Sequence, residues 1–167
     1  MTGMLKRRTE RRQAEREDNA TLRLVLFHIG SERYGLDIAG VREIDRLHAI
    51  TRVPQALSFV EGVIHLRGMI VPVIDLAKRF GQPAIVPGRH TRIIVAHLAG
   101  QSVGLIVDAV AEVIAIPAKS LGPPPPLTFE RTARFVAGMV RVGEGLVAVL
   151  SLDRLLSTEE VAQLSLL

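Results

Sequence analysis

Apolar residues in this chain fall into short runs that glycine and polar residues separate. The runs are rich in Val, Ile and Leu, and short β-branched runs bounded by such residues are typical of β-strands. We predict strands over residues 22–29, 34–38, 41–51, 60–66, 69–76, 92–98, 103–107, 110–116, 136–142 and 146–150. Many short strands with Gly-containing turns between them favour small barrels over a parallel α/β sheet.

Two segments depart from the alternation of apolar and polar positions. Residues 69–76 are almost uniformly apolar, which predicts a strand covered on both faces, and Pro72 within it predicts an edge or bulge position. Near the C-terminus, Ser157 and Glu160 have the spacing of a capping box, which predicts a short helix running to about Leu164.

The strand pattern occurs twice along the chain. Residues 59–76 and 135–152 are identical at six of eighteen positions. Upstream, a second set of identical pairs has an offset of 69: His28/His97, Gly35/Gly104, Leu36/Leu105, Val41/Val110 and Glu43/Glu112. We interpret the two halves as similar β units built on one plan. Features that both halves share therefore indicate fold, whereas the 66–68 turn and Pro72, present only in the first half, are candidates for function.

Composition narrows the class of protein. The 167 residues suit one domain or two small subdomains, and 48% of them are hydrophobic, enough for a packed core. The apolar runs are shorter than the roughly 20 residues that a membrane span needs. The chain has no Cys and opens on no secretory signal pattern, so we expect a cytoplasmic protein that does not insert into membranes.

Charge is concentrated at the N-terminus. Residues 1–20 contain six basic and four acidic side chains, so they carry a net charge of +2, half of the +4 of the whole chain. These residues have almost no apolar periodicity, so we expect a solvated tail that is disordered or a frayed helix. A basic-tailed β-barrel that binds nucleic acid is an alternative, but the interleaved acids argue against it, and few aromatic residues are available for base stacking.

No pattern indicates an enzyme or a cofactor site. The sequence lacks G-x-S-x-G, P-loop, H-E-x-x-H and G-x-G-x-x-G motifs, and none of its five His lies three or four residues from another. We therefore predict no catalytic residues, no metal site and no cofactor. A recognition module fits better. Arg67 lies at a predicted hairpin tip, and Val41 and Glu43 share one face of a strand. The competing interpretations are a solvated turn residue and a solvated acid beside a core valine.

Residues 62–76, together with 34–38, 41–44, 103–108 and 135–138, resemble the bacterial chemotaxis coupling proteins of the CheW family. The resemblance covers roughly residues 22–164. It implies an all-β fold of two five-stranded SH3-like barrels packed on a shared apolar core, with a short C-terminal helix. It further implies that residues 21–167 form one domain, with a first barrel mainly from 35–90, a second mainly from 91–150, and termini that cross between them.

The resemblance also implies a function. The family links the cytoplasmic tips of methyl-accepting chemoreceptors to the regulatory domain of the histidine kinase CheA, and multivalent arrays at the membrane strengthen these contacts. By position, a receptor-binding face would comprise Val41, Glu43, Gly62, Arg67 and Gly68. A kinase-binding groove would comprise Gly104, Val110 and Val113. His65 replaces the usual Asn, so an adaptor in a non-flagellar chemosensory system is an alternative.

Overall fold

The computed structural model describes residues 2–18, 20–123 and 132–167, so Met1 and Asn19 of the predicted tail lie outside it. The strands are β1 (Thr21–Ile29), β2 (Glu32–Asp37), β3 (Val41–Arg46), β4 (Val60–Leu66), β5 (Met69–Asp75), β6 (Arg92–Leu98), β7 (Gln101–Val107), β8 (Ala109–Pro117), β9 (Val136–Val142) and β10 (Gly145–Leu150). The helices are α1 (Thr2–Asp18), α2 (Leu76–Arg79), α3 (Leu152–Leu155) and α4 (Thr158–Leu164), with 3-10 turns at Ile38–Gly40, Ala118–Ser120 and Ala133–Phe135. The predicted strands and the helix after the capping box are confirmed, except that the strand predicted over 41–51 ends at Arg46 and leaves only an isolated bridge at Thr51.

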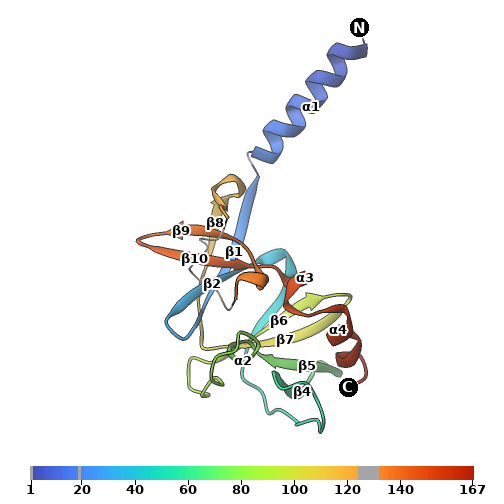
Figure 1. Ribbon diagram of the computed structural model, residues 1–167, viewed down its shortest axis with the longest axis vertical. Helices are drawn as coiled ribbons and strands as arrows, with labels where there is room; N and C mark the ends of the chain where they lie inside the picture. Colours follow the sequence, from blue (N-terminus) through green and yellow to red (C-terminus); the bar gives the residue numbers. More distant parts are fainter. Residues whose placement is uncertain (1, 19, 124–131) are drawn as a thin grey trace.

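The strands form two five-stranded sheets, ordered β3-β6-β7-β5-β4 and β8-β1-β2-β10-β9 (Figure 1). We call them the first and the second barrel, because backbone pairing brings the two edges of each sheet together. In the first barrel Thr51, beyond the end of β3, pairs with Val63 of β4. In the second barrel Gly122, beyond the end of β8, pairs with Met139 of β9. The predicted fold class is confirmed.

The predicted division of the chain between the barrels needs correction. Strands β6 and β7 lie beyond residue 90, yet they belong to the first barrel, and β1 and β2 belong to the second. Two parallel strand pairs place these strands in the barrel of the other half of the chain. Strand β5 pairs with β7 at Val73↔Gly104, and β10 pairs with β2 at Val149↔Gly35. Each half of the chain thus gives its leading hairpin to the barrel of the other half, which ties the barrels together.

Apolar side chains on the two faces of a strand enter different cores. In β1, Leu24 and Leu26 pack inside the second barrel, whereas Val25 and Phe27 face the core shared by both barrels. An equivalent interior fills the first barrel, with Ile64, Val71, Val73, Ile93, Val95 and Ile106. Double-sided burial explains why the strands read as continuous apolar runs.

Strand β5 agrees only in part with its prediction. Residues 71–76 are buried, but Met69 and Ile70 at the start of the strand are 52% and 56% exposed. The predicted edge or bulge position of Pro72 is wrong, because β5 lies between β7 and β4 and the bulge of this pair lies in β4. Pro72 is opposite Val63 of β4 and comes just before the parallel pairing with β7, which begins at Val73.

Helix α1 projects away from the barrels (Figure 1). The sequence predicted a charged tail here, either disordered or a frayed helix, and the structure has a helix. Its Arg, Glu, Gln and Ala residues have high helix propensity, so a helix forms without the apolar stripe that packing would require. Within the described residues, no helix is both long enough and apolar enough to span a membrane.

Candidate functional site

The β4–β5 hairpin carries the polar turn that only the first half of the chain possesses. Arg67 and Gly68 have φ angles of 51° and 77°, the positive pair that a two-residue type I′ turn requires. Arg67 is one of few non-glycine residues in this region of φ, which is uncommon for such a side chain. The predicted tight hairpin is confirmed, and it places a guanidinium at the tip of a rigid pair of strands.

Glu43 of β3 holds that guanidinium. Nη2 of Arg67 lies 3.2 Å from Oε2 of Glu43, and the two side chains are 79% and 22% exposed respectively. An exposed pair of this kind contributes only about 0–1 kcal/mol to stability. Its effect is positional, because most of the Arg67 donors stay available to a partner while the carboxylate fixes their location. The sequence singled out both residues, and the structure brings them together.

Val41 and Gly62 have different roles from the charged pair. The predicted common face of Val41 and Glu43 is wrong, because a β-bulge lies between them. Val41 is opposite Ala96 and packs partly against the shared core, whereas Glu43 is opposite Val95, which faces the interior of the first barrel. Gly62 lies in a β-bulge with φ 143°, where an added Cβ would be 2.1 Å from the carbonyl oxygen of Thr51. Gly62 therefore helps the barrel to close, because the absence of a side chain lets the Thr51 backbone lie directly against this strand.

The three residues predicted for the kinase-binding groove do not form one surface. Gly104 is buried in β7 of the first barrel, where an added Cβ would lie 3.0 Å from Cγ2 of Ile93, so its place in a groove of the second half needs correction. Val110 packs partly against the shared core. Val113, in edge strand β8 of the second barrel, is 51% exposed and is available for contact.

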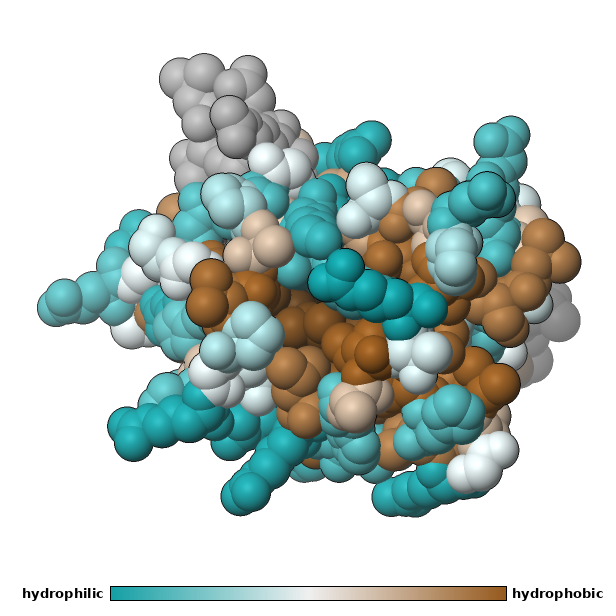
Figure 2. All heavy atoms as spheres, turned by 90° about the horizontal axis from the view of Figure 1, so that it is seen from below, coloured by the Kyte–Doolittle hydropathy of each residue, from teal (hydrophilic) through white to brown (hydrophobic). Residues whose placement is uncertain are grey.

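The sequence did not lead us to predict an apolar surface that lies beside the Arg67 hairpin. Met69 and Ile70 line an open pocket of about 280 Å³ together with Arg42, Pro72, His97, Gly100, Gln101, Ser102, Leu164, Ser165 and Leu167. Seen from the end opposite α1, hydrophobic side chains form a partly hollowed stretch that hydrophilic side chains border (Figure 2). The uniform apolar run from residue 69 carried the signal, but we interpreted it as complete burial.

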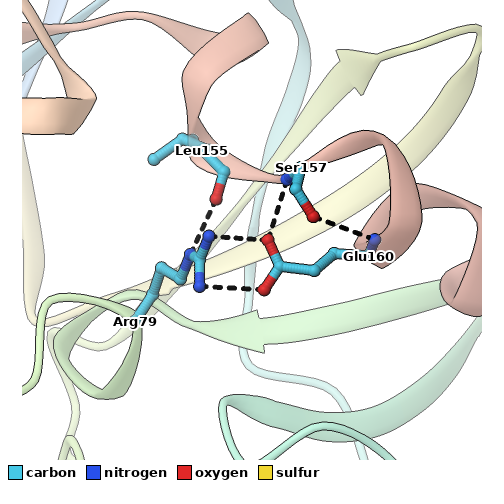
Figure 3. Close-up of polar contacts among 4 residues, drawn as sticks. All are labelled: Arg79, Leu155, Ser157 and Glu160. Atoms are coloured by element: carbon cyan, nitrogen blue, oxygen red, sulfur yellow. Dashed lines mark hydrogen bonds and ion pairs between the residues drawn. The ribbon is translucent and has the colours of Figure 1, made fainter.

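A second cluster links α2 to the C-terminal helices. Nη1 and Nη2 of Arg79 donate to Glu160 at 3.0 and 2.7 Å, and Nε donates to the carbonyl of Leu155 at 2.7 Å (Figure 3). The guanidinium carbon lies 4.5 Å from the ring centroid of Phe59 and 4.9 Å from that of Phe135. Sequence reasoning did not find this cluster, whose charged members are 81 residues apart.

Burial and pairing shift the ionisation of this cluster. Desolvation lowers the pKa of Arg79, although Glu160 opposes that change. Burial acts to raise the pKa of Glu160, but hydrogen bonds from Ser157 and the positive charge of Arg79 outweigh it, so this pKa lies below its ordinary value. The lowered pKa keeps Glu160 ionised at neutral pH, and a guanidinium such as that of Arg79 stays charged in proteins. The cluster fixes α4 rather than offering reactive groups, and no set of metal-binding side chains gathers among the described residues.

Comparison with known proteins agrees with this architecture. Residues 23–160 match the family model described as CheW-like domain. The chain is 34% identical to the chemotaxis protein CheW of Klebsiella aerogenes over 138 residues, 83% of each protein. It is 33% identical to that of Treponema pallidum over 146 residues, 85% of this chain and 86% of the relative.

A solved structure gives the same result in three dimensions. The scaffolding protein TtCheW from Thermoanaerobacter tengcongensis is 42% identical, with a TM-score of 0.76 over 84% of this chain and 91% of that one. Helix α1 precedes the residues that the family model matches. The resemblance noted from the sequence is confirmed: the chain belongs to the CheW-like domain family.

Proposed function

We propose that this protein is a non-enzymatic adaptor that couples chemoreceptor tips to the regulatory domain of a CheA-type histidine kinase. Relatives over most of the chain are named chemotaxis proteins, and the solved relative is titled a scaffolding protein. The observation that carries the proposal on this chain is the Arg67–Glu43 pair on a rigid hairpin tip. The protein would join membrane receptor arrays through its receptors, without inserting into the bilayer.

The receptor-binding face would centre on this pair. Arg67 would fork onto carboxylates or carbonyls of a receptor helix, while Glu43 sets the direction of the fork. Val41 and the glycines Gly62 and Gly68 would support the face by shaping the backbone around it. The adjoining apolar side chains of Met69 and Ile70 offer contact area that a charged tip alone does not provide.

Replacing Arg67 by Glu should abolish receptor control of the kinase and leave the fold intact. The new carboxylate would face Glu43 and repel both it and an acidic partner, but the site is exposed, so unfolding should hardly change. Kinase activity in reconstituted receptor assemblies measures the coupling, and thermal unfolding measures the fold. Arg141→Glu, an equal charge change at an exposed position of β9, is the matched control. Equal coupling by both variants would remove Arg67 from the site.

The kinase-binding surface would involve the second barrel around Val113. An exposed valine on an edge strand can seat against an apolar surface of a partner barrel. Titration calorimetry of this protein into an isolated CheA regulatory domain, at moderate salt, should show saturable one-to-one binding. Val113→Asp should weaken that binding about tenfold or more, because burying an unpaired carboxylate at an interface is costly. Lack of binding to several such domains would contradict the kinase partner but not the family membership.

A further inference from the structure

Two arginines face each other across the β3–β6 pair of the first barrel. Arg46 of β3 and Arg92 of β6 are directly opposite in the antiparallel register, so their side chains leave the same face of the sheet. Like charges placed directly opposite destabilise a sheet. The nearest acid along β3, Asp45, lies on the alternate face, where His48 is 4.0 Å from it. In the part of the chain that the structure describes, no ion pair joins either arginine to an acid.

A third arginine completes the arrangement. Arg46, Arg89 and Arg92 line an open pocket of about 370 Å³, whose other walls are Leu47, Gly88 and Thr91. The loop before β6 is folded around Thr91, whose Oγ1 accepts from the Gly88 amide at 2.8 Å and whose own amide donates to the Gly88 carbonyl at 3.2 Å. The pocket is thus bounded by a strand pair and by a hydrogen-bonded turn.

The guanidinium of Arg92 is held in position. Its Nη1 donates to the backbone carbonyls of Arg89 and Thr91, each at 2.8 Å. These bonds use one terminal nitrogen and leave the other donors available. Nε of Arg89 lies 3.1 Å from Nε2 of His90, an imidazole nitrogen that accepts when the ring is neutral. Three cations therefore line one pocket, and their described partners are two backbone carbonyls and one imidazole, none of them an acid.

We propose that this pocket binds an oxyanion carrying a dianionic phosphate group, either free phosphate or a phosphomonoester. Guanidinium groups match phosphate oxygens in pairs, and a dianion offsets more of the charge of three arginines than a single carboxylate does. Such a ligand would turn the unfavourable Arg46–Arg92 juxtaposition into a favourable one. The site shares no residue with the proposed adaptor faces, so a test that contradicts one proposal leaves the other unaffected.

The test is thermal unfolding of the full chain in phosphate against chloride at equal ionic strength. We expect the Tm to rise saturably, by about 3–6 °C at a tenfold excess of phosphate over its Kd. Arg46→Gln should keep or raise the Tm in chloride, because it removes the repulsion, yet weaken phosphate binding at least tenfold in calorimetry. This combination separates a lost site from a lost fold. Arg141→Gln, at an exposed position of the second barrel, should respond to phosphate as the wild type does.

Two further ligands distinguish the sources of the phosphate group. Tighter binding of glycerol 3-phosphate than of inorganic phosphate would indicate a phosphomonoester, and the reverse order would indicate the free ion. Acetate at the same ionic strength should give a smaller shift, because it carries one charge. Equal Tm values in phosphate and chloride, or an unchanged phosphate response in Arg46→Gln, would overturn the proposal.

Discussion

Gly62→Ala is expected to lower the free energy of unfolding by about 3 kcal/mol or more, one of the two largest effects we predict. The backbone φ of 143° strains any residue with a Cβ, at a cost of about 1–3 kcal/mol. The added carbon would also lie 2.1 Å from the Thr51 carbonyl oxygen. That oxygen accepts from the Val63 amide at 2.9 Å, and the Thr51 amide donates to the Val63 carbonyl at 2.9 Å, so relief of the clash would open the barrel. Denaturant unfolding measures the loss.

Gly68→Ala is the matched control. Its φ of 77° is also positive, but an added Cβ there would have no atom within 4 Å. We expect this variant to lose only about 1 kcal/mol, the ordinary cost of a side chain in the left-handed region. If both variants lose the same amount, backbone strain alone explains the effect and the contact with Thr51 does not matter.

Much of the fold could be predicted because strand burial leaves a clear trace in sequence. Runs of Val, Ile and Leu marked the strands, and the internal repeat marked two related units. The identical pair Gly62/Gly138 marked barrel closure in each unit: at Gly138 an added Cβ would lie 2.8 Å from the carbonyl oxygen of Gly122. That glycine is required for fold in both halves, as the repeat had indicated. The turn at Arg67, present in one half only, proved to carry the exposed ion pair.

The partner of each strand could not be predicted in the same way. Strands β5 and β7 are both buried on two faces, and their apolar sequences say which faces are covered but not which strand lies alongside. The exchange of hairpins and the burial of Gly104 in the first barrel follow from that pairing. The Arg79–Glu160 contact was hidden for a related reason, because charged residues in short helices read as solvent-exposed until a tertiary neighbour encloses them.

Arg79→Met is expected to cost about 2–4 kcal/mol in the free energy of unfolding. The change removes both hydrogen bonds to Glu160 and the bond to Leu155, and it leaves a carboxylate that is 19% exposed without its cation. Glu160→Gln should cost less, since its amide oxygen still accepts a hydrogen bond. The double variant should lose less than the sum of the two single losses, because the second change removes the carboxylate that the first one left unpaired. Strictly additive losses would show that the pair is not coupled.

Acidification should reproduce the loss of this pair without a mutation. The pKa of Glu160 is lower in the folded chain than its ordinary value of 4.5, so the native state favours the carboxylate. Its contribution is fully present above about pH 4.5 and is lost as the pH falls through the lower, folded-state pKa. The stability difference between the wild type and Glu160→Gln should therefore be constant near neutral pH and should narrow below pH 4.5. Glu159→Gln, a change at an exposed neighbour in the same helix, should follow the wild type throughout. A difference that stays constant down to pH 3 would mean that the pair holds α4 by shape and packing, and that its charge adds nothing to the stability of the fold.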